Sequence, residues 1–441
     1  MNRRRFLAGG AAAPLLAQRR ERPSFIFILS DDHHYQCLGA AGNPHIRTPH
    51  LDRLASRGAI FTNAAISTPQ CAPSRGVLLS GLETFQSGLR SNGARGFREG
   101  IGPLVIEQLR RSGYQTGLVG KWHIAGRPAA CGFSHAPLWL PAGSSRYLDP
   151  MLCRGLDGSP RREPGHITDL FTAAAVDFVR SARRPYFLWL AYNAPHTPWQ
   201  AGETYRRLYH GKTPAEIAPP AHPRDAGPFD WPTYYAVITH LDEAIGRLVS
   251  ELETTGAWSN TVLCFLGDNG YLCGARGLNG KVHPWEPSVR VPFLAAGGPV
   301  ANGLRTAAPA ASIDLPATWL DMAGVPPAYR LAGSSLRNLL TTGKGGPEEG
   351  FAVWDDGRPE ALSIHVAVEP YRQVRTGRHK LTVWESGRQA LYDHVADPRE
   401  ERDLLSDPAH ARTLADLRRR LEARMRATGD TAAPWLRSAT P

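Results

Sequence analysis

The sequence predicts an α/β fold: a large, mostly parallel mixed sheet flanked by helices on both faces, followed by a smaller antiparallel sheet with one helix. Three observations lead to this expectation. Runs of strand length alternate with amphipathic helical patterns along most of the chain. The first apolar run, 24–29, is unbroken, as expected of a strand that is covered on both faces. Beyond 342–347 the pattern changes to short strands and a charged helix.

Four strands and four helices are expected in the first part. The first helix has Thr48 as its N-cap and Pro49 as its first residue, and Gly58 stops it. The other elements follow from the spacing of their apolar residues. The strands are expected at 24–29, 115–120, 186–192 and 261–266, and the remaining helices at 104–112, 168–182 and 231–255.

The 441 residues suffice for one large domain and a smaller one. We expect a targeting segment at 1–17, the main α/β domain at 22–342 and an α+β subdomain at 347–441. The Gly/Pro-rich stretch 342–347 is interpreted as a linker. The subdomain's short strands are expected at 351–354, 371–376, 380–384 and 390–392, and its helix at 408–427.

The first residues carry a twin-arginine pattern. Three arginines precede Phe6 and Leu7, and a mild apolar run continues to Ala17. This run is too short to span a bilayer, which takes about 20 apolar residues. The pattern predicts export, with a periplasmic or secreted product; a disordered basic N-terminus is the alternative. Because no other spanning stretch is visible, stable membrane insertion is not expected.

Composition narrows the class of partner. The hydrophobic content of 42% is that of an ordinary folded protein, and the formal charge is +11. The arginines are scattered, so the charge suits an anionic substrate without defining a basic stripe. No zinc-finger, leucine-zipper or RNA-binding signature is present, and nucleic acid is therefore not an expected partner.

Six cysteines are too few for a disulfide scaffold, and none has the spacing of a zinc site. Export would permit a bridge, and Cys131 with Cys153 is the pair to test because both lie in a loop-rich stretch. Cys264 lies in an apolar strand and is expected in the core. Cys71, in a tight Pro-Gln-Cys-Ala-Pro-Ser-Arg frame, would by itself be an ordinary turn cysteine.

Polar side chains follow each of the four strands. They are Asp31 and Asp32, Lys121 and His123, His196, and Asp268 and Asn269. Ligands of open α/β sheets bind at the carboxyl ends of the strands, so these side chains are expected at one edge. Any one of them could instead be a helix cap or a solvated loop residue.

The residue types at this edge indicate a chemistry. Asp31, Asp32, Asp268 and Asn269 offer oxygen ligands only, which favours Ca²⁺ or Mg²⁺ over zinc. Arg75, Lys121, His123, His196 and Lys281 could bind a tetrahedral oxyanion and supply a proton to a leaving group. Cys71 does not fit, because a soft thiolate is a poor partner for a hard cation.

These residues resemble a family. Cys71-Ala72-Pro73-Ser74-Arg75 matches the Cys-x-Pro-Ser-Arg signature of the type I sulfatases, members of the alkaline phosphatase superfamily, in which the cysteine is oxidised to formylglycine. Further motifs resemble the family in the same order along about 24–405. They are Asp31-Asp32, Asn43-Pro44, 48–54, Gly120-Lys121-Trp122-His123, Gly267-Asp268-Asn269, Lys281 with 285–292, and Leu391-Tyr392-Asp393.

The resemblance implies an alkaline-phosphatase-like fold and the hydrolysis of a sulfate ester. A maturation enzyme would oxidise Cys71, and the aldehyde hydrate would offer two oxygens, one to attack sulfur and one to expel sulfate later. By the same resemblance Asp31, Asp32, Asp268, Asn269 and modified Cys71 hold Ca²⁺, or Mg²⁺ in its place. Further roles follow from it: Arg75 and Lys121 orient the hydrate, His123 acts as base, and His196 and Lys281 bind the sulfate and assist the leaving oxygen.

Some stretches depart from the commonest family pattern. His33-His34 follow Asp32, and His34 faces either the substrate or the surface. The segment 125–165 is expected to be loop-like, and its basic residues either form part of the pocket rim or are simply solvated. They are Arg127, His135, Arg146, Arg154, Arg161 and Arg162. In the C-terminal part, His365, His379 and His394 are expected to be structural or on the rim.

Three functions are considered. The leading one is a sulfatase acting on a sulfated carbohydrate or an aryl sulfate. The second is a phosphonate or phosphate-diester hydrolase of the same superfamily, and the third an inactive exported sugar-binding relative. The intact set of Cys71, Lys121, His123 and Lys281 argues against the third, because a decayed site should have lost at least one of them.

Overall fold

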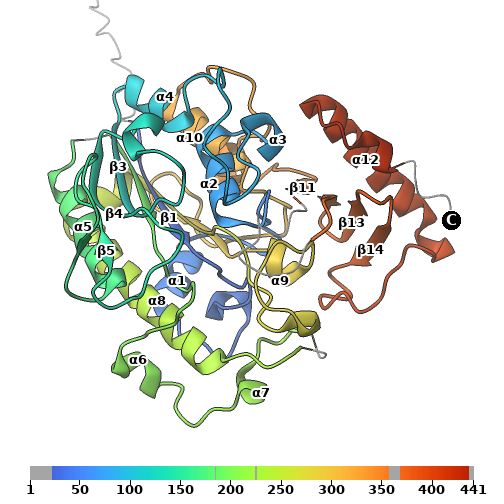
Figure 1. Ribbon diagram of the computed structural model, residues 1–441, viewed down its shortest axis with the longest axis horizontal. Coiled ribbons are helices and arrows are strands. Elements are labelled where there is room, and N and C mark those ends of the chain that lie inside the picture. The colour runs from blue at the N-terminus through green and yellow to red at the C-terminus, as the bar shows by residue number, and fades with distance from the viewer. Residues whose placement is uncertain (1–21, 184, 224–225, 357–367, 437–441) are drawn as a thin grey trace, which may run out of the picture.

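The computed structural model describes residues 22–183, 185–223, 226–356 and 368–436. Two sheets dominate these residues, with helices around the larger one and one long helix on the smaller (Figure 1). The predicted fold class is confirmed. The expected targeting segment 1–17 and His365 lie outside the described residues.

The larger sheet has eight strands in the order β10-β2-β9-β8-β1-β7-β3-β4. In chain order they are β1 Ser24–Ser30, β2 Gly58–Phe61, β3 Gln115–Lys121, β4 His135–Leu140, β7 Tyr186–Ala191, β8 Thr261–Gly267, β9 Phe293–Ala296 and β10 Leu304–Thr306. Only β9 runs antiparallel to its neighbours, β2 and β8, and the other pairings within this sheet are parallel. The sheet is therefore mostly parallel and mixed, as expected.

Strand β1 lies at the centre and separates two cores. Phe25, Phe27 and Leu29 point to one face, where they join residues of α2, α4 and α10. Ile26 and Ile28 point to the other face and join α1, α5 and α8. This alternation buries the whole strand, which is why its sequence is an unbroken apolar run.

The helices around this sheet vary in length. Those on the two cores are α1 Pro49–Ser56, α2 Cys71–Ser80, α4 Val105–Arg111, α5 Ile167–Ser181, α8 Trp231–Thr254 and α10 Asp314–Ala323. Shorter ones are α3 Thr84–Ser87, α6 Glu203–Arg207, α7 Pro214–Ile217, α9 Glu286–Val289 and α11 Arg337–Thr342. None of the described helices is long and apolar enough to cross a membrane.

The C-terminal part forms a second, antiparallel sheet in the order β11-β12-β13-β14. Its strands are β11 Gly350–Trp354, β12 Tyr371–Arg375, β13 His379–Trp384 and β14 Gln389–Asp393, and α12 Ala411–Thr428 packs on them through Leu417, Leu421 and Met425. Figure 1 shows this sheet and α12 at one side of the molecule, next to α9.

The stretch 125–165 is largely loop, as expected, but it also supplies β4, the edge strand of the large sheet, and a hairpin of β5 Met151–Leu152 and β6 Arg161–Arg162. The sequence left open whether Cys131 and Cys153 form a disulfide, and both are free. Each packs as a small apolar side chain in the core, Cys131 at the end of a short 3-10 helix and Cys153 opposite Trp139 of β4.

Candidate active site

The carboxyl ends of four adjacent strands, β8, β1, β7 and β3, bring the predicted polar residues together. Backbone hydrogen bonds join the segments that leave these strands. The Asp31 N–H donates to Ala194 O at 3.0 Å, and the Asp268 N–H donates to Ser30 O at 2.8 Å. The site therefore rests on the rigid edge of the sheet, where its carboxylates are held within the core and shielded from water.

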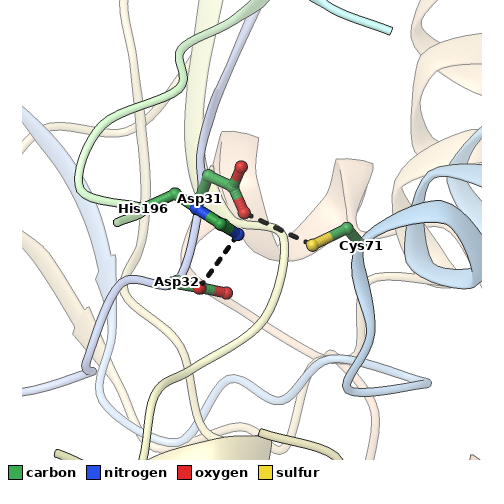
Figure 2. A group of neighbouring side chains, drawn as sticks. All are labelled: Asp31, Asp32, Cys71 and His196. Carbon is green, nitrogen blue, oxygen red and sulfur yellow. Dashed lines mark hydrogen bonds and ion pairs between the residues drawn. The ribbon is translucent and has the colours of Figure 1, made fainter. Parts of the chain in front are cut away.

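Cys71 is the first residue of α2, with Gln70 as the preceding cap residue. The first turn is fixed from outside the helix, because Asn92 Oδ1 accepts from the Ala72 N–H at 3.0 Å and the Asn92 N–H donates to Gln70 Oε1 at 3.0 Å. The Cys71 thiol lies 3.5 Å from Asp31 Oδ1 (Figure 2). Burial, together with the Asp31 charge, raises the pKa of this thiol to about 12.

Three buried cations pair with three buried carboxylates. Lys121 binds Asp31, Lys281 binds Asp32, and Arg75 Nη2 lies 2.7 Å from Asp268 Oδ2. Arg75 Nη1 also donates to Lys121 O at 2.6 Å, which links two of the pairs. Burial would raise the pKa of Asp31, but Lys121 and His196 hold it well below its ordinary value.

Two histidines complete the group. His196 Nε2 lies 3.6 Å from Asp32 Oδ2, and its backbone carbonyl accepts from the Tyr147 hydroxyl at 2.8 Å (Figure 2). His123 follows β3 with a φ of +53° and packs against Gly143, whose Cα has no room for a side chain there. Burial, with Lys121 and Arg75, lowers the pKa of His123 to about 2, so this imidazole is neutral.

The donor set fits a hard cation. One ligand atom each of Asp31, Asp32, Cys71 and His196 lie within 4.8 Å of one another. Among the described residues, Asp31 Oδ1 is contacted by the Cys71 thiol at 3.5 Å and Asp32 Oδ2 by His196 at 3.6 Å, so both oxygens keep acceptor capacity. Asn269 Nδ2 donates to Asp32 Oδ1 at 2.6 Å, while Asn269 Oδ1 is buried with no hydrogen-bond partner among the described residues. Carboxylate and amide oxygens are what Ca²⁺ or Mg²⁺ prefers.

Asp268 stands slightly apart from this set. Its Oδ1 accepts from the Asp32 N–H at 3.3 Å and its Oδ2 from Arg75. Burial and the neighbouring Asp31 raise the pKa of Asp268 to about 6. A bound cation would offset the repulsion between the Asp31 and Asp268 carboxylates and favour the ionised form of both.

This fold and this edge of acids, cations and histidines define an enzyme of the alkaline phosphatase superfamily. Within it the chain belongs to the sulfatase family, whose family model, "Sulfatase", matches residues 23–325. A second model, described as N-sulphoglucosamine sulphohydrolase, C-terminal, matches residues 274–427. The resemblance seen in the motifs is confirmed, and the protein is a sulfuric ester hydrolase.

Relatives cover most of the chain. The ulvan-active sulfatase of Formosa agariphila is 27% identical, over 93% of this chain and 82% of the relative. Human arylsulfatase A is 30% identical, over 85% of this chain and 77% of the relative. A solved structure in complex with D-glucosamine-2-N,6-O-disulfate superposes with a TM-score of 0.80 at 23% identity, over 93% of this chain and 99% of that one, which supports the fold.

The structure bears on two alternatives that the sequence left open. His34 is not at the surface: it is fully buried, with its ring stacked on Tyr35 at 4.9 Å and edge-on to Trp231 at 5.7 Å. In the 125–165 segment, Arg154 pairs with Glu163 and Arg162 with Asp149, each at 2.6 Å, rather than with the site.

Sequence reasoning missed Asn92 and Tyr147, which hold the first turn of α2 and the His196 loop. Neither residue belongs to a motif, and neither follows a predicted strand. Only the structure shows their contacts.

Proposed function

We propose that the protein hydrolyses the sulfate ester of a carbohydrate, using a formylglycine made from Cys71 and a bound Ca²⁺. The observation that carries this proposal is the position of Cys71 at the start of α2, between the Lys281 ammonium at 2.8 Å and the Asp31 carboxylate at 3.5 Å. A thiol whose pKa is about 12 is a poor nucleophile, so the site makes chemical sense only if this residue is converted.

Charge supports an anionic substrate. The buried carboxylates of Asp31, Asp32 and Asp268 are matched one for one by Lys121, Lys281 and Arg75. A divalent cation held by Asp31, Asp32, Asp268, Asn269 and the modified Cys71 would leave the site with an excess positive charge. A sulfate monoester, which is a monoanion, would compensate part of it.

The formylglycine hydrate would supply the nucleophilic oxygen, and the cation would neutralise negative charge at the reacting group. Around them, Lys121 and Arg75 orient the modified side chain, and neutral His123 accepts a proton. His196 and Lys281 bind the sulfate and assist the departing alcohol oxygen. Overall one water is consumed: the ester S–O bond breaks, the alcohol oxygen gains a proton, and the oxygen from water leaves in sulfate.

Two further parts of the proposal concern the cell. A formylglycine-generating maturation enzyme would recognise the Cys71–Arg75 frame. Residues 1–17 would direct export by the twin-arginine route to the periplasm or beyond, consistent with a polymeric or oligomeric glycan as the substrate.

The test uses the full chain co-expressed with a formylglycine-generating enzyme. Mass spectrometry of the peptide that contains Cys71 should show the mass change for CH₂–SH becoming CHO. Sulfate release should then be measured on a panel of sulfated mono- and oligosaccharides beside an aryl sulfate and a phosphodiester. Cys71→Ala should abolish release, whereas Cys264→Ala, in the middle of β8, should retain it. A natively matured protein with an unmodified thiol, or a strong preference for phosphodiesters, would contradict the proposal.

A further inference from the structure

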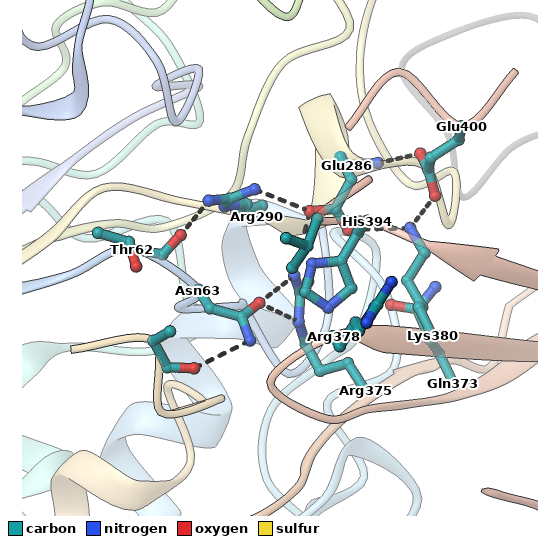
Figure 3. Close-up of polar contacts among 12 residues, drawn as sticks. Thr62, Asn63, Glu286, Arg290, Gln373, Arg375, Arg378, Lys380, His394 and Glu400 are labelled. Carbon is teal, nitrogen blue, oxygen red and sulfur yellow. Dashed lines mark hydrogen bonds and ion pairs between the residues drawn. The ribbon is translucent and has the colours of Figure 1, made fainter. Parts of the chain in front are cut away.

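A buried ion network joins the C-terminal subdomain to the segment that carries Lys281. Its centre is Glu286, the first residue of α9 (Figure 3). Lys380 Nζ, from β13, donates to Glu286 Oε1 at 2.9 Å and also pairs with Glu400. Arg375 Nη2, at the end of β12, lies 3.1 Å from Glu286 Oε2. All four side chains are at most 2% exposed.

The same subdomain also binds the backbone that precedes α9. Pro284 O accepts from Lys380 Nζ at 3.1 Å and from Gln373 Nε2 at 2.9 Å. The Glu286 N–H donates to Glu400 Oε2 at 2.7 Å. Residues 284–286 are therefore held by β12, β13 and the segment after β14, not by the main domain alone.

The backbone is strained at Val282, which lies between Lys281 and the segment 284–286. Val282 has a φ of +71°, a left-handed conformation that a β-branched residue rarely adopts. Its N–H donates to Pro69 O at 3.1 Å, two residues before Cys71. Such strain persists only where surrounding contacts over-determine the backbone. Here the backbone is held at Val282 by Pro69 and at residues 284–286 by the C-terminal subdomain. These contacts set the direction in which the Lys281 side chain points.

Stability alone is a weak reason for such a network. Buried ion pairs lose hydration that their attraction often does not recover, and apolar replacements of the same volume can be as stable. Burial would raise the pKa of Glu286, yet Arg375 and Lys380 hold it well below its ordinary value, so its charge is kept in a dry site. Unlike apolar packing, each ion pair and hydrogen bond of this network requires a defined geometry. The network therefore fixes the positions of the atoms that it joins.

We propose that Lys380, with Gln373 and Glu286, positions Lys281, so that the C-terminal subdomain sets the reactivity of a site in the main domain. This inference rests on the proposed role of Lys281 in binding the sulfate and assisting the departing alcohol oxygen. None of the three residues contacts the site itself. They act through the segment 281–286, whose other end brings Lys281 Nζ to 2.8 Å from Cys71 Sγ.

The experiment compares Lys380→Met and Gln373→Met with a matched control, Arg372→Met. Arg372 is also buried on β12 and paired, with Asp355 at 2.7 Å and Asp430, but it does not contact 284–286. Gln373→Met removes the bond to Pro284 without leaving a charge unpaired, so it stays informative if Lys380→Met folds poorly. For each purified, formylglycine-containing protein, Tm, kcat and KM are measured on one sulfate ester.

Lys380→Met should lower kcat by about 10- to 100-fold with KM within about threefold of wild type. Gln373→Met should lower kcat by at least about threefold in the same way, and Arg372→Met should leave kcat within about twofold even where it lowers Tm. The inference is overturned if Gln373→Met leaves kcat unchanged or if Arg372→Met lowers it as much as Lys380→Met. If wild type releases no sulfate from any ester, the proposed function fails instead.

Discussion

Lys281 Nζ lies 2.8 Å from the Sγ of Cys71, although the two residues are 210 positions apart in the chain. The same ammonium group binds Asp32, while the other side of Cys71 faces Asp31. The residue that is proposed to become the nucleophile therefore sits between a cation and an anion in a dry environment, where electrostatic effects are larger than in water.

Replacing Lys281 should disable the chemistry. Lys281→Met keeps the side-chain volume but removes the charge that would face the sulfate group. We expect kcat/KM on a sulfate ester to fall by about 100- to 1000-fold. The matched control is Lys344→Met, an exposed lysine, which should behave as wild type. Equal activity of the two variants would contradict the role given to Lys281.

The proposed cation should contribute to stability as well as activity. Chelation should lower Tm and sulfate release together, and added Ca²⁺ should restore both, because a ligand present at about 1000 times its Kd adds about 4 kcal/mol to folding stability. In Asp31→Asn, Tm should no longer respond to Ca²⁺, whereas Asp157→Asn, with 89% of its side chain exposed, should respond normally. A wild-type Tm that is indifferent to both chelator and Ca²⁺ would exclude this site.

At Gly120, directly before Lys121, the backbone packs so closely against the neighbouring strand that no side chain fits. Its φ is +104°, and a Cβ there would lie 1.9 Å from Ala191 O on the neighbouring strand. Gly126 has a φ of +86°, but a Cβ there would have nothing within 4 Å. Gly126→Ala should therefore cost only the left-handed penalty, about 1 kcal/mol.

Gly120→Ala adds a backbone clash to the same penalty, so it should cost about 3 kcal/mol or more and displace Lys121. Urea unfolding of both variants measures the difference, and sulfate release reports the displacement. Similar losses for the two variants would show that the strand adjusts, and that Lys121 is placed less rigidly than the structure indicates.

Sequence patterns were informative where local rules decide the outcome. The unbroken apolar run of β1 predicted a strand covered on both faces, and the polar residues after four strands predicted which residues meet at one edge. Both follow from the sheet itself, since parallel strands expose their carboxyl ends together. The Cys-x-Pro-Ser-Arg frame then pointed to one family.

Other features depend on contacts that no local pattern encodes. Strand β2 has only four residues directly after α1, so Gly58 was interpreted as the end of a helix alone. Strand β4 was not predicted, because it lies within a stretch rich in Gly, Pro and Arg that is typical of loops. No local pattern around His34 predicts that the rings of Tyr35 and Trp231 pack against it. The pairing of Glu286 with Lys380 joins residues that are 94 positions apart in the chain, one in α9 and the other in β13 of the smaller sheet.

Burial of His394 should make the protein less stable in acid. Its Nε2 lies 3.1 Å from Thr376 O, and burial, with the nearby Arg375 charge, lowers its pKa from 6.5 to about 3. Below pH 6.5 the unfolded chain binds a proton at this position that the folded protein does not, so stability falls as the pH drops toward 3. The loss should reach about 2 kcal/mol between pH 7 and pH 5.

The measurement is the Tm between pH 7 and pH 5. The Tm should fall less steeply with decreasing pH for His394→Gln than for wild type, whereas His210→Gln, at an exposed position, should keep the wild-type slope. Parallel slopes for wild type and His394→Gln would show that this histidine is protonated as readily in the folded protein as in the unfolded chain.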